Sequence, residues 1–363
     1  MTDIAKKRIG LVFGGRSEEH EISVLSASSV AGAIDKDRYE VVPVLIAKDG
    51  SWHLLWDGSA GIEGIGTLDD PRFKTLVSEA RPVTIAEFDA LCDFAFPALH
   101  GPYGEDGTIQ GLFEMLGKPY AGCGVASSAI TMDKIFTKQL WENAGLPVAK
   151  YLAYAHPKDF YGEGGAGKMA EMERIAKELG FPLFVKPANL GSSVGITRVT
   201  EFGGIEPAFE VAFRHDFRVI AEKGVDAREL EVGLLGDAAD TRASVVGEVL
   251  HIGHAFYDYE SKYSDSATEV VVPADIPGDV SETIRELVCR AYRVVGGDGF
   301  ARVDLFYEEK TGNIYLNELN SIPGFTQFSM FPSLWGKAGL PYAELVEWII
   351  EKGYERYKAK NNR

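Results

Sequence analysis

The segment ARVDLFYEEKTGNIYLNELNS, residues 301–321, decides the fold of this chain. It consists of two strand-like runs, Ala301–Tyr307 and Asn313–Glu318, joined by the polar connection EEKTG at 308–312. A short connection that ends in glycine predicts that the two runs pair as neighbouring strands. The side chains on one face of this pair then determine whether the segment is a binding site or a plain surface hairpin.

Four polar residues are expected on the same face of these strands. Side chains alternate between faces along a strand, so Arg302 and Asp304 point the same way, and so do Glu318 and Asn320. Carboxylate and amide oxygens without His or Cys suit Mg²⁺, which proteins hold through few carboxylates plus substrate phosphates. A surface hairpin with solvated acids fits the same pattern. The asparagine near the glutamate, and the Pro-Gly turn that follows, favour a metal site.

Composition and charge exclude several classes of function. The chain has 363 residues, 45% hydrophobic and 25% charged, which predicts a globular protein of two or three domains. Its net charge of −17 argues against nucleic acid and against an anionic membrane as partners, because both need a basic face. The three cysteines are isolated, so neither a disulfide framework nor a cysteine metal site is expected. The N-terminus does not resemble a secretory signal and no stretch is long enough to span a membrane, so we expect a cytoplasmic protein.

Strand and helix patterns alternate in the first third of the chain. The predicted strands are Arg8–Phe13, Tyr39–Ile46 and Asp93–Leu99, and the predicted helices are Ser23–Ile34 and Thr108–Leu116. This βαβ order predicts a parallel sheet covered by helices. Residues 58–82 are rich in Gly, Asp and Pro, and we expect them to form a surface excursion.

Helices and strands are mixed in the rest of the chain. The predicted helices are Met132–Asn143, Met169–Leu179, 281–295 and 341–358. The predicted strands, apart from the pair described above, are Leu183–Lys186, 218–223, 229–235 and 242–250. Polar loops are expected at 156–167 and 257–268.

The motif VKPANLGSSVG at 185–195 has the features of a phosphate-covering loop. Lys186 at a strand end offers a point charge, and Gly191 and Gly195 let the backbone approach a ligand. It is neither a P-loop, because GxxxxGK[ST] is absent, nor a dinucleotide-binding fingerprint. An ordinary β-hairpin turn fits the same residues, so this motif is weak evidence by itself.

Three further segments each allow two interpretations. Glu21 in GGRSEEHEISVLSA fits a helix start favoured by the helix dipole, or an anion that receives a ligand ammonium; the residues alone favour the helix start. His100 in HGPYGEDGT fits either substrate orientation or a structural hydrogen bond. Lys262 and Tyr263 in DYESKYSD are expected to reach inward as lid residues, with a solvated loop as the alternative.

Together these segments resemble the D-alanine–D-alanine ligase family of the ATP-grasp superfamily. The resemblance covers nearly the whole chain, through GGRSEEHEIS, HGPYGEDGTIQGLFE, MDK, FVKPANLGSSVGI, AEKGVDARELEVGLL, YDYESKYSD, GFARVDLF and NELNSIPGFTQFSMFP. It implies a mixed α/β fold with an N-terminal parallel-sheet domain at 1–130 on the side of the first D-alanine. A central ATP-grasp subdomain with the Gly/Ser loop is implied at 131–220, and a C-terminal one with the lid loop and metal site at 221–363.

The resemblance also implies ATP and two Mg²⁺ ions as cofactors, with Mn²⁺ as a substitute. The residues implied to bind ATP are Lys134, Lys186, Ser193, Glu222, Lys223, Val225, Glu229 and Lys262. The residues implied to hold the metal ions are Asp304, Glu318 and Asn320.

The substrate residues follow from the same resemblance. Glu21 is implied to bind the ammonium of the first D-alanine and to form a hydrogen-bonded triad with Ser192 and Tyr263. Arg302 and the Gly324 N–H are implied to donate hydrogen bonds to the tetrahedral oxyanion. Ser329 and the Met330 N–H are implied to bind the carboxylate of the second D-alanine. His100 is a further substrate-binding candidate.

The implied reaction joins two D-alanines through an acyl phosphate, with release of ADP and phosphate, for peptidoglycan precursor synthesis. A homodimer is implied as well. A D-alanine–D-lactate ligase is the near alternative, and Tyr263 argues against it because lactate-using relatives tend to differ there. A non-catalytic ATP-grasp binding protein should lack the metal ligands. Another ATP-grasp ligase, such as a carboxylase subunit, should lack HGPYGEDGT and the Glu21 loop.

The stretch SIPGFTQFSMFP departs from some relatives. It carries Phe325, Phe328 and Met330 where smaller or different apolar residues are expected in some members. The shape of the pocket for the second amino acid is therefore open at this point.

Overall fold

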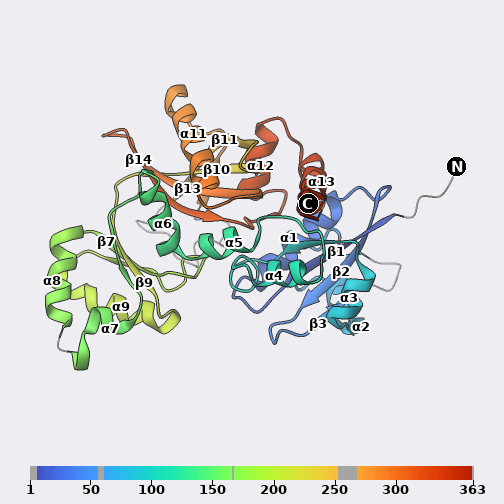
Figure 1. Cartoon of the computed structure of the whole chain (residues 1–363), viewed down its shortest axis with the longest axis horizontal. Helices are drawn as coiled ribbons and strands as arrows, with labels where there is room; N and C mark the ends of the chain where they lie inside the picture. The colour runs from blue at the N-terminus through green and yellow to red at the C-terminus, as the bar shows by residue number, and fades with distance from the viewer. Residues whose placement is uncertain (1–5, 56–60, 166, 252–267, 362–363) are drawn as a thin grey trace.

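Three β-sheets organise the chain in the computed structural model, which describes residues 6–55, 61–165, 167–251 and 268–361 (Figure 1). The predicted lid residues Lys262 and Tyr263 lie outside the described residues. No helix of the described part is long and apolar enough to cross a membrane.

The N-terminal sheet has the strand order β4-β3-β2-β1-β5. Strand β1 (Lys7–Gly14) pairs in parallel with β2 (Tyr39–Ile46) and with β5 (Phe94–Ala98), which confirms the predicted parallel core. Two short strands, β3 (Trp52–Leu54) and β4 (Arg81–Pro82), extend one edge in antiparallel fashion. The carboxyl ends of the parallel strands lead into the loops that carry Glu19 and His100.

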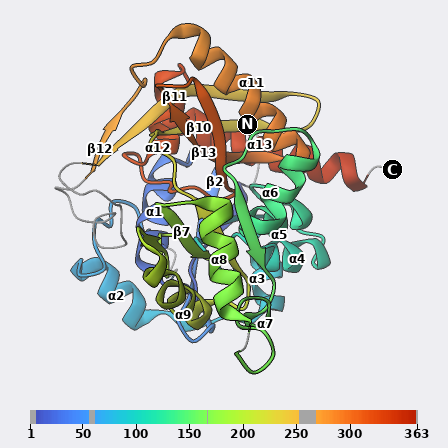
Figure 2. The same cartoon turned by 90° about the vertical axis from the view of Figure 1, so that its left-hand side faces the viewer.

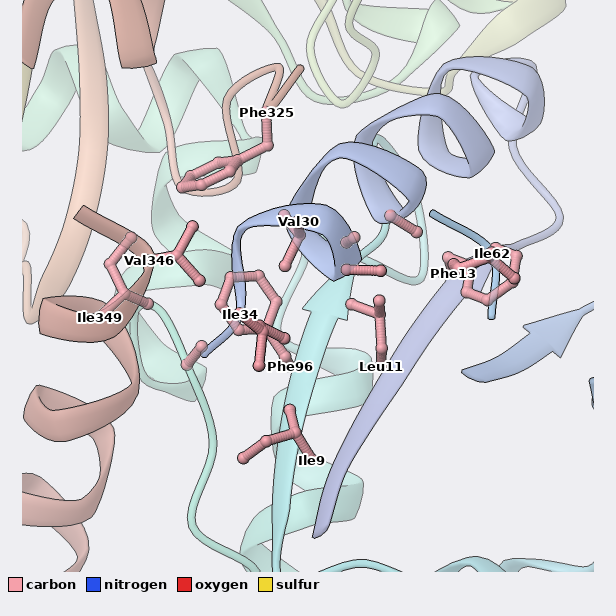
Figure 3. Packing of buried hydrophobic residues seen from close by; sticks show 14 of the residues in the cluster. Ile9, Leu11, Phe13, Val30, Ile34, Ile62, Phe96, Phe325, Val346 and Ile349 are labelled. Carbon is pink, nitrogen blue, oxygen red and sulfur yellow. The ribbon is translucent and has the colours of Figure 1, made fainter. Parts of the chain in front are cut away.

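Helices bury both faces of this sheet. Residues of α1 (His20–Ala33) and of the C-terminal helix α13 (Tyr342–Asn361) pack into one hydrophobic cluster with Ile9, Leu11 and Phe13 of β1 (Figure 3). The opposite face is covered by α3 (Ile85–Leu91) and α4 (Thr108–Met115). The last helix of the chain therefore completes the core that the first strand begins.

The predicted surface excursion at 58–82 is wrong in part, because it contains a helix. Helix α2 (Pro71–Glu79) buries Phe73 and Leu76 in the same cluster as β1. Asp70 caps this helix by accepting a hydrogen bond from the Arg72 N–H, and proline is well tolerated at the first helical position. The Gly, Asp and Pro content that suggested a loop is, at this point, a helix-start signal.

The middle sheet has the strand order β6-β9-β7-β8 and is antiparallel throughout. Its strands are β6 (Tyr151–Tyr154), β9 (Val219–Lys223), β7 (Leu183–Pro187) and β8 (Thr197–Val199). The helices of this part are α7 (Pro157–Tyr161), α8 (Lys168–Leu179) and α9 (Ile205–His215), with the short turns η1 (Glu163–Gly165) and η2 (Phe202–Gly204). Helix α7 occupies the insert that was expected to be a loop at 156–167, and it buries Phe160 against the sheet.

The third sheet has the strand order β12-β11-β10-β13-β14. Its strands are β10 (Arg228–Gly236), β11 (Thr241–His251), β12 (Thr268–Val271), β13 (Gly299–Glu308) and β14 (Asn313–Asn320). Val232 and Leu234 pack toward α11 (Gly278–Val294), whereas a Cβ built at the intervening Gly233 would meet α12 (Met330–Lys337). The two helices therefore cover opposite faces, and β13 and β14 pair as the sequence predicts.

The predicted helix Met132–Asn143 is divided in two. Helix α5 (Val125–Met132) ends, and α6 (Lys134–Asn143) begins after Asp133, whose carboxylate accepts the N–H groups of Ile135 and Phe136. An aspartate in this position is a strong N-cap. The break makes Lys134 the first residue of a new helix, and its backbone N–H donates to the Ala188 carbonyl oxygen, just after β7 of the middle sheet. Figure 2 shows this middle part from the side of its helices α7, α8 and α9.

Phe325 connects the third sheet to the N-terminal core. It lies in the loop between β14 and α12 and is buried against Phe96 of β5, with ring centroids 6.1 Å apart, and against Phe300 of β13, at 5.4 Å (Figure 3). Val346 of α13 lies in the same cluster. The departure noted at Phe325 is therefore a packing feature, which fixes the loop that carries Gly324.

Candidate active site

A cavity of about 620 Å³ lies between the middle and third sheets. Its walls include the loop at 190–193, strands β7 and β9 on one side, and β10, β13 and β14 on the other. The residues predicted to bind ATP that line it are Lys134, Lys186, Ser193, Glu222, Lys223, Val225 and Glu229. Residues from distant parts of the sequence thus meet in one space, although their individual roles stay predictions.

The predicted metal ligands come together through the register of β13 and β14. Asp304 stands directly opposite Glu318, and Arg302 stands opposite Asn320. The Asn320 side-chain amide donates a hydrogen bond to Asp304 Oδ2 at 3.1 Å. A register shift follows Asp304, so that Asn317 is the extra residue of a bulge. Strand alternation had predicted this shared face, and the pairing adds that the two carboxylates are direct cross-strand neighbours.

Cations hold the two carboxylates in place. Arg302 donates to both oxygens of Asp304, from Nε at 2.6 Å and from Nη2 at 2.7 Å. Lys134 Nζ lies 3.2 Å from Glu318 Oε2. Burial alone would lower the pKa of Arg302, but Asp304 and Glu231 outweigh it and raise that pKa well above its ordinary value. Arg302 therefore stays charged at the floor of the cavity.

Glu231 is a site residue that the sequence reasoning missed. Its Oε2 lies 2.9 Å from Arg302 Nε, and its backbone pairs with Asp304 across β10 and β13. The signal was present, because Glu229 and Glu231 alternate onto one face of β10 just as Arg302 and Asp304 do on β13.

The donor set fits a hard divalent cation that completes its shell elsewhere. Like charges placed directly opposite each other in an antiparallel pair are destabilising without a counter-ion. The described residues contain no group of three or more His, Cys, Asp or Glu that could hold a metal. The ligands available here are the carboxylates of Asp304 and Glu318 and the side-chain amide of Asn320. Mg²⁺ prefers such a site, in which one or two carboxylates bind it and phosphate and water supply the remaining oxygens.

The wall of the cavity formed by β7 and β9 contains a buried ion cluster. Lys186 Nζ lies 2.7 Å from Glu222 Oε2, and Lys138 Nζ lies 2.5 Å from Glu222 Oε1. Burial raises the pKa of a carboxyl group, yet the two lysines outweigh it and lower the pKa of Glu222 to about 2. Lys138 was not predicted, although it follows Lys134 by one helical turn and so shares its face of α6.

The loop at 190–195 has the backbone of a ligand-binding turn. Ser192 and Ser193 have φ angles of 50° and 59°, in the left-handed region that non-glycine residues rarely adopt. Such strained residues cluster at ligand clamps, where surrounding contacts hold them. The first of these contacts is a short hydrogen bond from the Ser192 hydroxyl to Glu19.

The predicted contact between Ser192 and Glu21 is wrong, because Glu19 takes that place. Glu21 is exposed on α1, whereas Glu19 is half-buried and precedes the helix. The resemblance implied Glu21 for this contact; the helix predicted at Ser23–Ile34 begins earlier, at His20, and so includes Glu21. The two glutamates lie two residues apart and point in different directions, and Glu19 is the one whose carboxylate reaches Ser192.

His100 is bonded at both ring nitrogens. Nδ1 lies 2.9 Å from the Ile322 carbonyl oxygen, so it is the donor, and Nε2 at 2.9 Å then accepts from Ser26 Oγ. Ser26 Oγ in turn accepts from the Phe325 N–H at 3.3 Å. Burial lowers the pKa of His100, which keeps the ring neutral. Of the two interpretations left open above, this geometry fits the structural one.

Glu105, which the sequence reasoning also missed, ties the same two loops together. Its carboxyl oxygens accept the Gly101 N–H at 2.8 Å and the Ile322 N–H at 3.0 Å. Burial, and next the charge of Glu19, raise the pKa of Glu105 to about 8. The motif HGPYGEDGT thus holds the loop after β14 from two points, His100 and Glu105.

That loop carries the residues predicted for the second substrate. A Cβ built at Gly324 would lie 3.2 Å from Ser329 Oγ, so these residues are close neighbours. Ser329 precedes α12, and its hydroxyl bonds to Thr326 Oγ1 at 2.8 Å rather than capping the helix. Met330, the first residue of α12, is buried, whereas Phe328 is 82% exposed. The N-terminus of α12 is therefore available to an anion.

Comparison with known proteins identifies the family. Residues 8–123 match the family model described as D-ala D-ala ligase N-terminus, and residues 140–351 match D-ala D-ala ligase C-terminus. This chain belongs to the D-alanine–D-alanine ligase family. It is 43% identical to the D-alanine–D-alanine ligase of Chloroherpeton thalassium over 99% of both chains. It is 41% identical to that of Geobacillus kaustophilus, over 98% of this chain and 96% of the relative.

Solved structures of the D-alanine–D-alanine ligase family share the fold. The D-alanine–D-alanine ligase of Coxiella burnetii aligns with a TM-score of 0.83 and 32% identity, over 98% of this chain and 96% of that one. A D-Ala:D-Ser ligase from Enterococcus faecalis aligns with a TM-score of 0.82 and 32% identity, over 96% of this chain and 100% of that one. Proteins with different second substrates thus share this backbone.

We predict that Ser26 and His100 act as one unit in stability. Ser26→Ala and His100→Leu each leave buried polar groups unpaired, and each should lower the free energy of unfolding by about 1–3 kcal/mol. Because both break the same chain of hydrogen bonds, the double variant should lose clearly less than the sum. Urea denaturation measures all three.

The matched control is Ser29→Ala, which removes an exposed hydrogen bond from the same helix to the same loop. We expect it to change stability by less than about 0.5 kcal/mol. Strictly additive losses for Ser26 and His100 would contradict the linked arrangement.

Proposed function

We propose that this chain uses ATP to join two D-alanine molecules into D-alanyl-D-alanine, the reaction that its family's name describes. The observation that carries the proposal is the cavity in which Lys134 and Lys186 face the pair Asp304 and Glu318. Cations along one wall and carboxylates along the other suit a nucleotide triphosphate with a divalent metal. The family adds the identity of the substrate.

The nucleotide would lie between the two sheets. Lys134 and Lys186 are proposed to bind phosphate oxygens, with the backbone of Ser193 covering them. Glu222, Lys223 and Val225 are proposed to contact the adenine, and Glu229 the ribose hydroxyls. All seven line the same cavity, which supports this assignment.

Two magnesium ions would be held by Asp304, Glu318 and Asn320. When bound, they supply positive charge that screens the phosphates and orients them for in-line transfer. This chain's own residues contribute the rest. Arg302 would share Asp304 with the metal and keep its contact with Glu231, and Lys134, which lies 3.2 Å from Glu318 Oε2, would be free to turn toward phosphate.

We propose Glu19, in place of Glu21, as the residue that binds the ammonium of the first D-alanine. Glu19 is bonded to Ser192 of the phosphate-covering loop and lies beside Gly101, where a Cβ would come within 2.7 Å of its Oε2. It therefore stands where the nucleotide side meets the N-terminal sheet. A carboxylate there orients the amino acid so that its own carboxylate faces the γ-phosphate.

The second D-alanine would be held by the loop after β14. Its carboxylate fits the N-terminus of α12, with Ser329 and the Met330 N–H as donors. His100 would position this loop through its hydrogen bond to the Ile322 carbonyl oxygen. Hydrogen bonds from Arg302 and the Gly324 N–H are proposed to stabilise the oxyanion that forms when the acyl carbon is attacked.

The reaction balances in two steps. A carboxylate oxygen of the first D-alanine attacks the γ-phosphorus, the bond to the ADP oxygen breaks, and an acyl phosphate forms. The ammonium of the second D-alanine first loses one proton to water. Its amine nitrogen then attacks the acyl carbon, the bond from that carbon to the phosphate oxygen breaks, and phosphate leaves with the second amine proton. Water must be excluded between the steps, because it would hydrolyse the acyl phosphate. Lys262 and Tyr263 stay predicted as the residues that close the site, Lys262 beside the transferring phosphate.

Other finer assignments stay predictions as well. The domain boundaries at 130 and 220, the homodimer and the cytoplasmic location rest on the sequence reasoning. The choice of second substrate rests on Tyr263, and the alternative D-alanine–D-lactate ligase is tested together with D-serine below.

Phosphate release by the purified protein tests the function. With ATP and Mg²⁺, D-alanine alone should support turnover with the dipeptide as product, whereas L-alanine should not. D-Alanine mixed with D-lactate or D-serine should still yield mainly D-alanyl-D-alanine, identified by mass. No release with D-alanine would refute the ligase assignment, and a preferred depsipeptide or D-Ala-D-Ser product would correct the second substrate.

Neutralising Glu19 should affect the first amino acid. Glu19→Gln keeps an acceptor for Ser192 but removes the charge that pairs with the ammonium, so the KM for the first D-alanine should rise by roughly 10–150-fold. The control Glu21→Gln makes the same change two residues away on the exposed face and should stay within about twofold. Steady-state kinetics over a wide D-alanine range measure both, and the reverse order would restore the Glu21 assignment.

Neutralising Glu318 should abolish turnover. Glu318→Gln removes one of the two facing carboxylates, and kcat should fall at least about 100-fold. Glu309→Gln is the control, because Glu309 is exposed on the connection of the same hairpin. Near-normal turnover in Glu318→Gln would show that the metal assignment is wrong.

A further inference from the structure

Lys138 is a buried lysine that the proposed reaction leaves without a role. It lies on α6 four residues after Lys134, and only 1% of its side chain is exposed. Lys134 and Lys186 line the nucleotide cavity, but Lys138 does not. Burying a long cationic side chain is costly unless it is paired, so this position needs a physical explanation.

Lys138 is one of two cations on a single buried carboxylate. Its Nζ lies 2.5 Å from Glu222 Oε1, while Lys186 Nζ lies 2.7 Å from Glu222 Oε2. The second polar neighbour of Lys138 is the Leu316 carbonyl oxygen, at 3.4 Å. Each oxygen of Glu222 therefore has its own lysine, and the cluster carries one positive charge more than its carboxylate neutralises.

We propose that Lys138 is a positioning residue, the fixed counter-ion of Glu222 that allows Lys186 to leave this carboxylate for a nucleotide phosphate. The inference rests on the proposed ATP-dependent function and concerns how its site is charged. Lys138 is shut off from the cavity and stays on Glu222. Lys186 faces the cavity and exchanges Glu222 Oε2 for a phosphate oxygen. The released Oε2 then accepts a hydrogen bond from the base.

The exchange depends on the surplus lysine. With Lys186 as its only partner, Glu222 would become an unpaired buried carboxylate whenever Lys186 turned to phosphate, and an uncompensated buried charge is strongly unfavourable. With Lys138 in place, one ion pair remains throughout. Burial lowers the pKa of Lys138 and the Glu222 carboxylate opposes this, which agrees with a lysine whose charge depends on that one partner.

Calorimetric titration with ADP and with adenosine, in Mg²⁺ buffer, tests the proposal without turnover. In Lys138→Met the Kd for ADP should rise at least about tenfold, because Lys186 is retained by Glu222. Adenosine has no phosphate and does not require Lys186 to move, so its Kd should change less than about threefold. Lys138→Gln keeps a hydrogen-bond donor without the charge and should behave like Lys138→Met.

A second background makes the test specific. In Glu222→Gln the buried carboxylate is gone, so adding Lys138→Met should change the Kd for ADP by less than about threefold. Lys118→Met is the control, because it removes a half-buried lysine paired with Asp89 in the N-terminal part and should leave ADP binding unchanged. Thermal unfolding of each variant establishes that the site is folded, and Lys138→Gln carries the test where Lys138→Met does not fold.

Three outcomes would overturn the proposal. Lys138 variants could bind ADP as the wild type does, or lose ADP and adenosine equally, as a merely structural residue would. The loss for ADP could also persist at full size in Glu222→Gln. Phosphate release by the wild-type chain with D-alanine is measured separately, so a failure of the Lys138 assignment and a failure of the ligase function are distinguishable.

Discussion

The repulsion between Asp304 and Glu318 constrains the rest of the site. The register of β13 and β14 sets these two carboxylates directly opposite each other, in a pairing that is unfavourable without cations. One cation, Arg302, comes from the same strand; another, Lys134, comes from the start of α6, outside the third sheet. The ion pair between Lys134 and Glu318 places the start of α6 against β14, the edge strand of that sheet. The opposing sheets, and the cavity between them, are thus linked through charge as well as through packing.

A second linkage fixes the loop after β14 to the N-terminal sheet. Phe325 supplies the apolar part, through its contacts with Phe96 and Phe300. The polar part is the chain from the Phe325 N–H through Ser26 to His100 and on to the Ile322 carbonyl. Because a buried group that loses its partner costs more than the bond contributes, such a chain resists partial opening. Gly324 lies between these anchored residues, which is the rigidity that an oxyanion donor requires.

The sequence predicts correctly the elements that depend on a local pattern of residues. Alternation along β13 and β14 predicted the shared face of Arg302, Asp304, Glu318 and Asn320, and the βαβ pattern predicted the parallel core of the first sheet. The prediction failed where two neighbouring glutamates compete for one role: the resemblance implied Glu21, whereas Glu19, two residues earlier, contacts Ser192. It also missed residues whose partners lie far away in sequence. Lys138 resembles any lysine of an amphipathic helix until β9 brings Glu222 to it.

The charges of the cavity fit the proposed binding of a nucleotide together with a metal ion. Its lysines are paired with its carboxylates, as in Lys186 with Glu222 and Lys134 with Glu318. A phosphate alone would draw the lysines away and leave the buried Glu222 and the half-buried Glu318 without counter-ions, and a cation alone would leave the lysines without their carboxylates. A magnesium–nucleotide complex carries charges of both signs and would replace both sets of ion pairs together. Glu222 is the exception, because it lies on the nucleotide side away from the metal pair, and a permanent partner such as Lys138 is what its position requires.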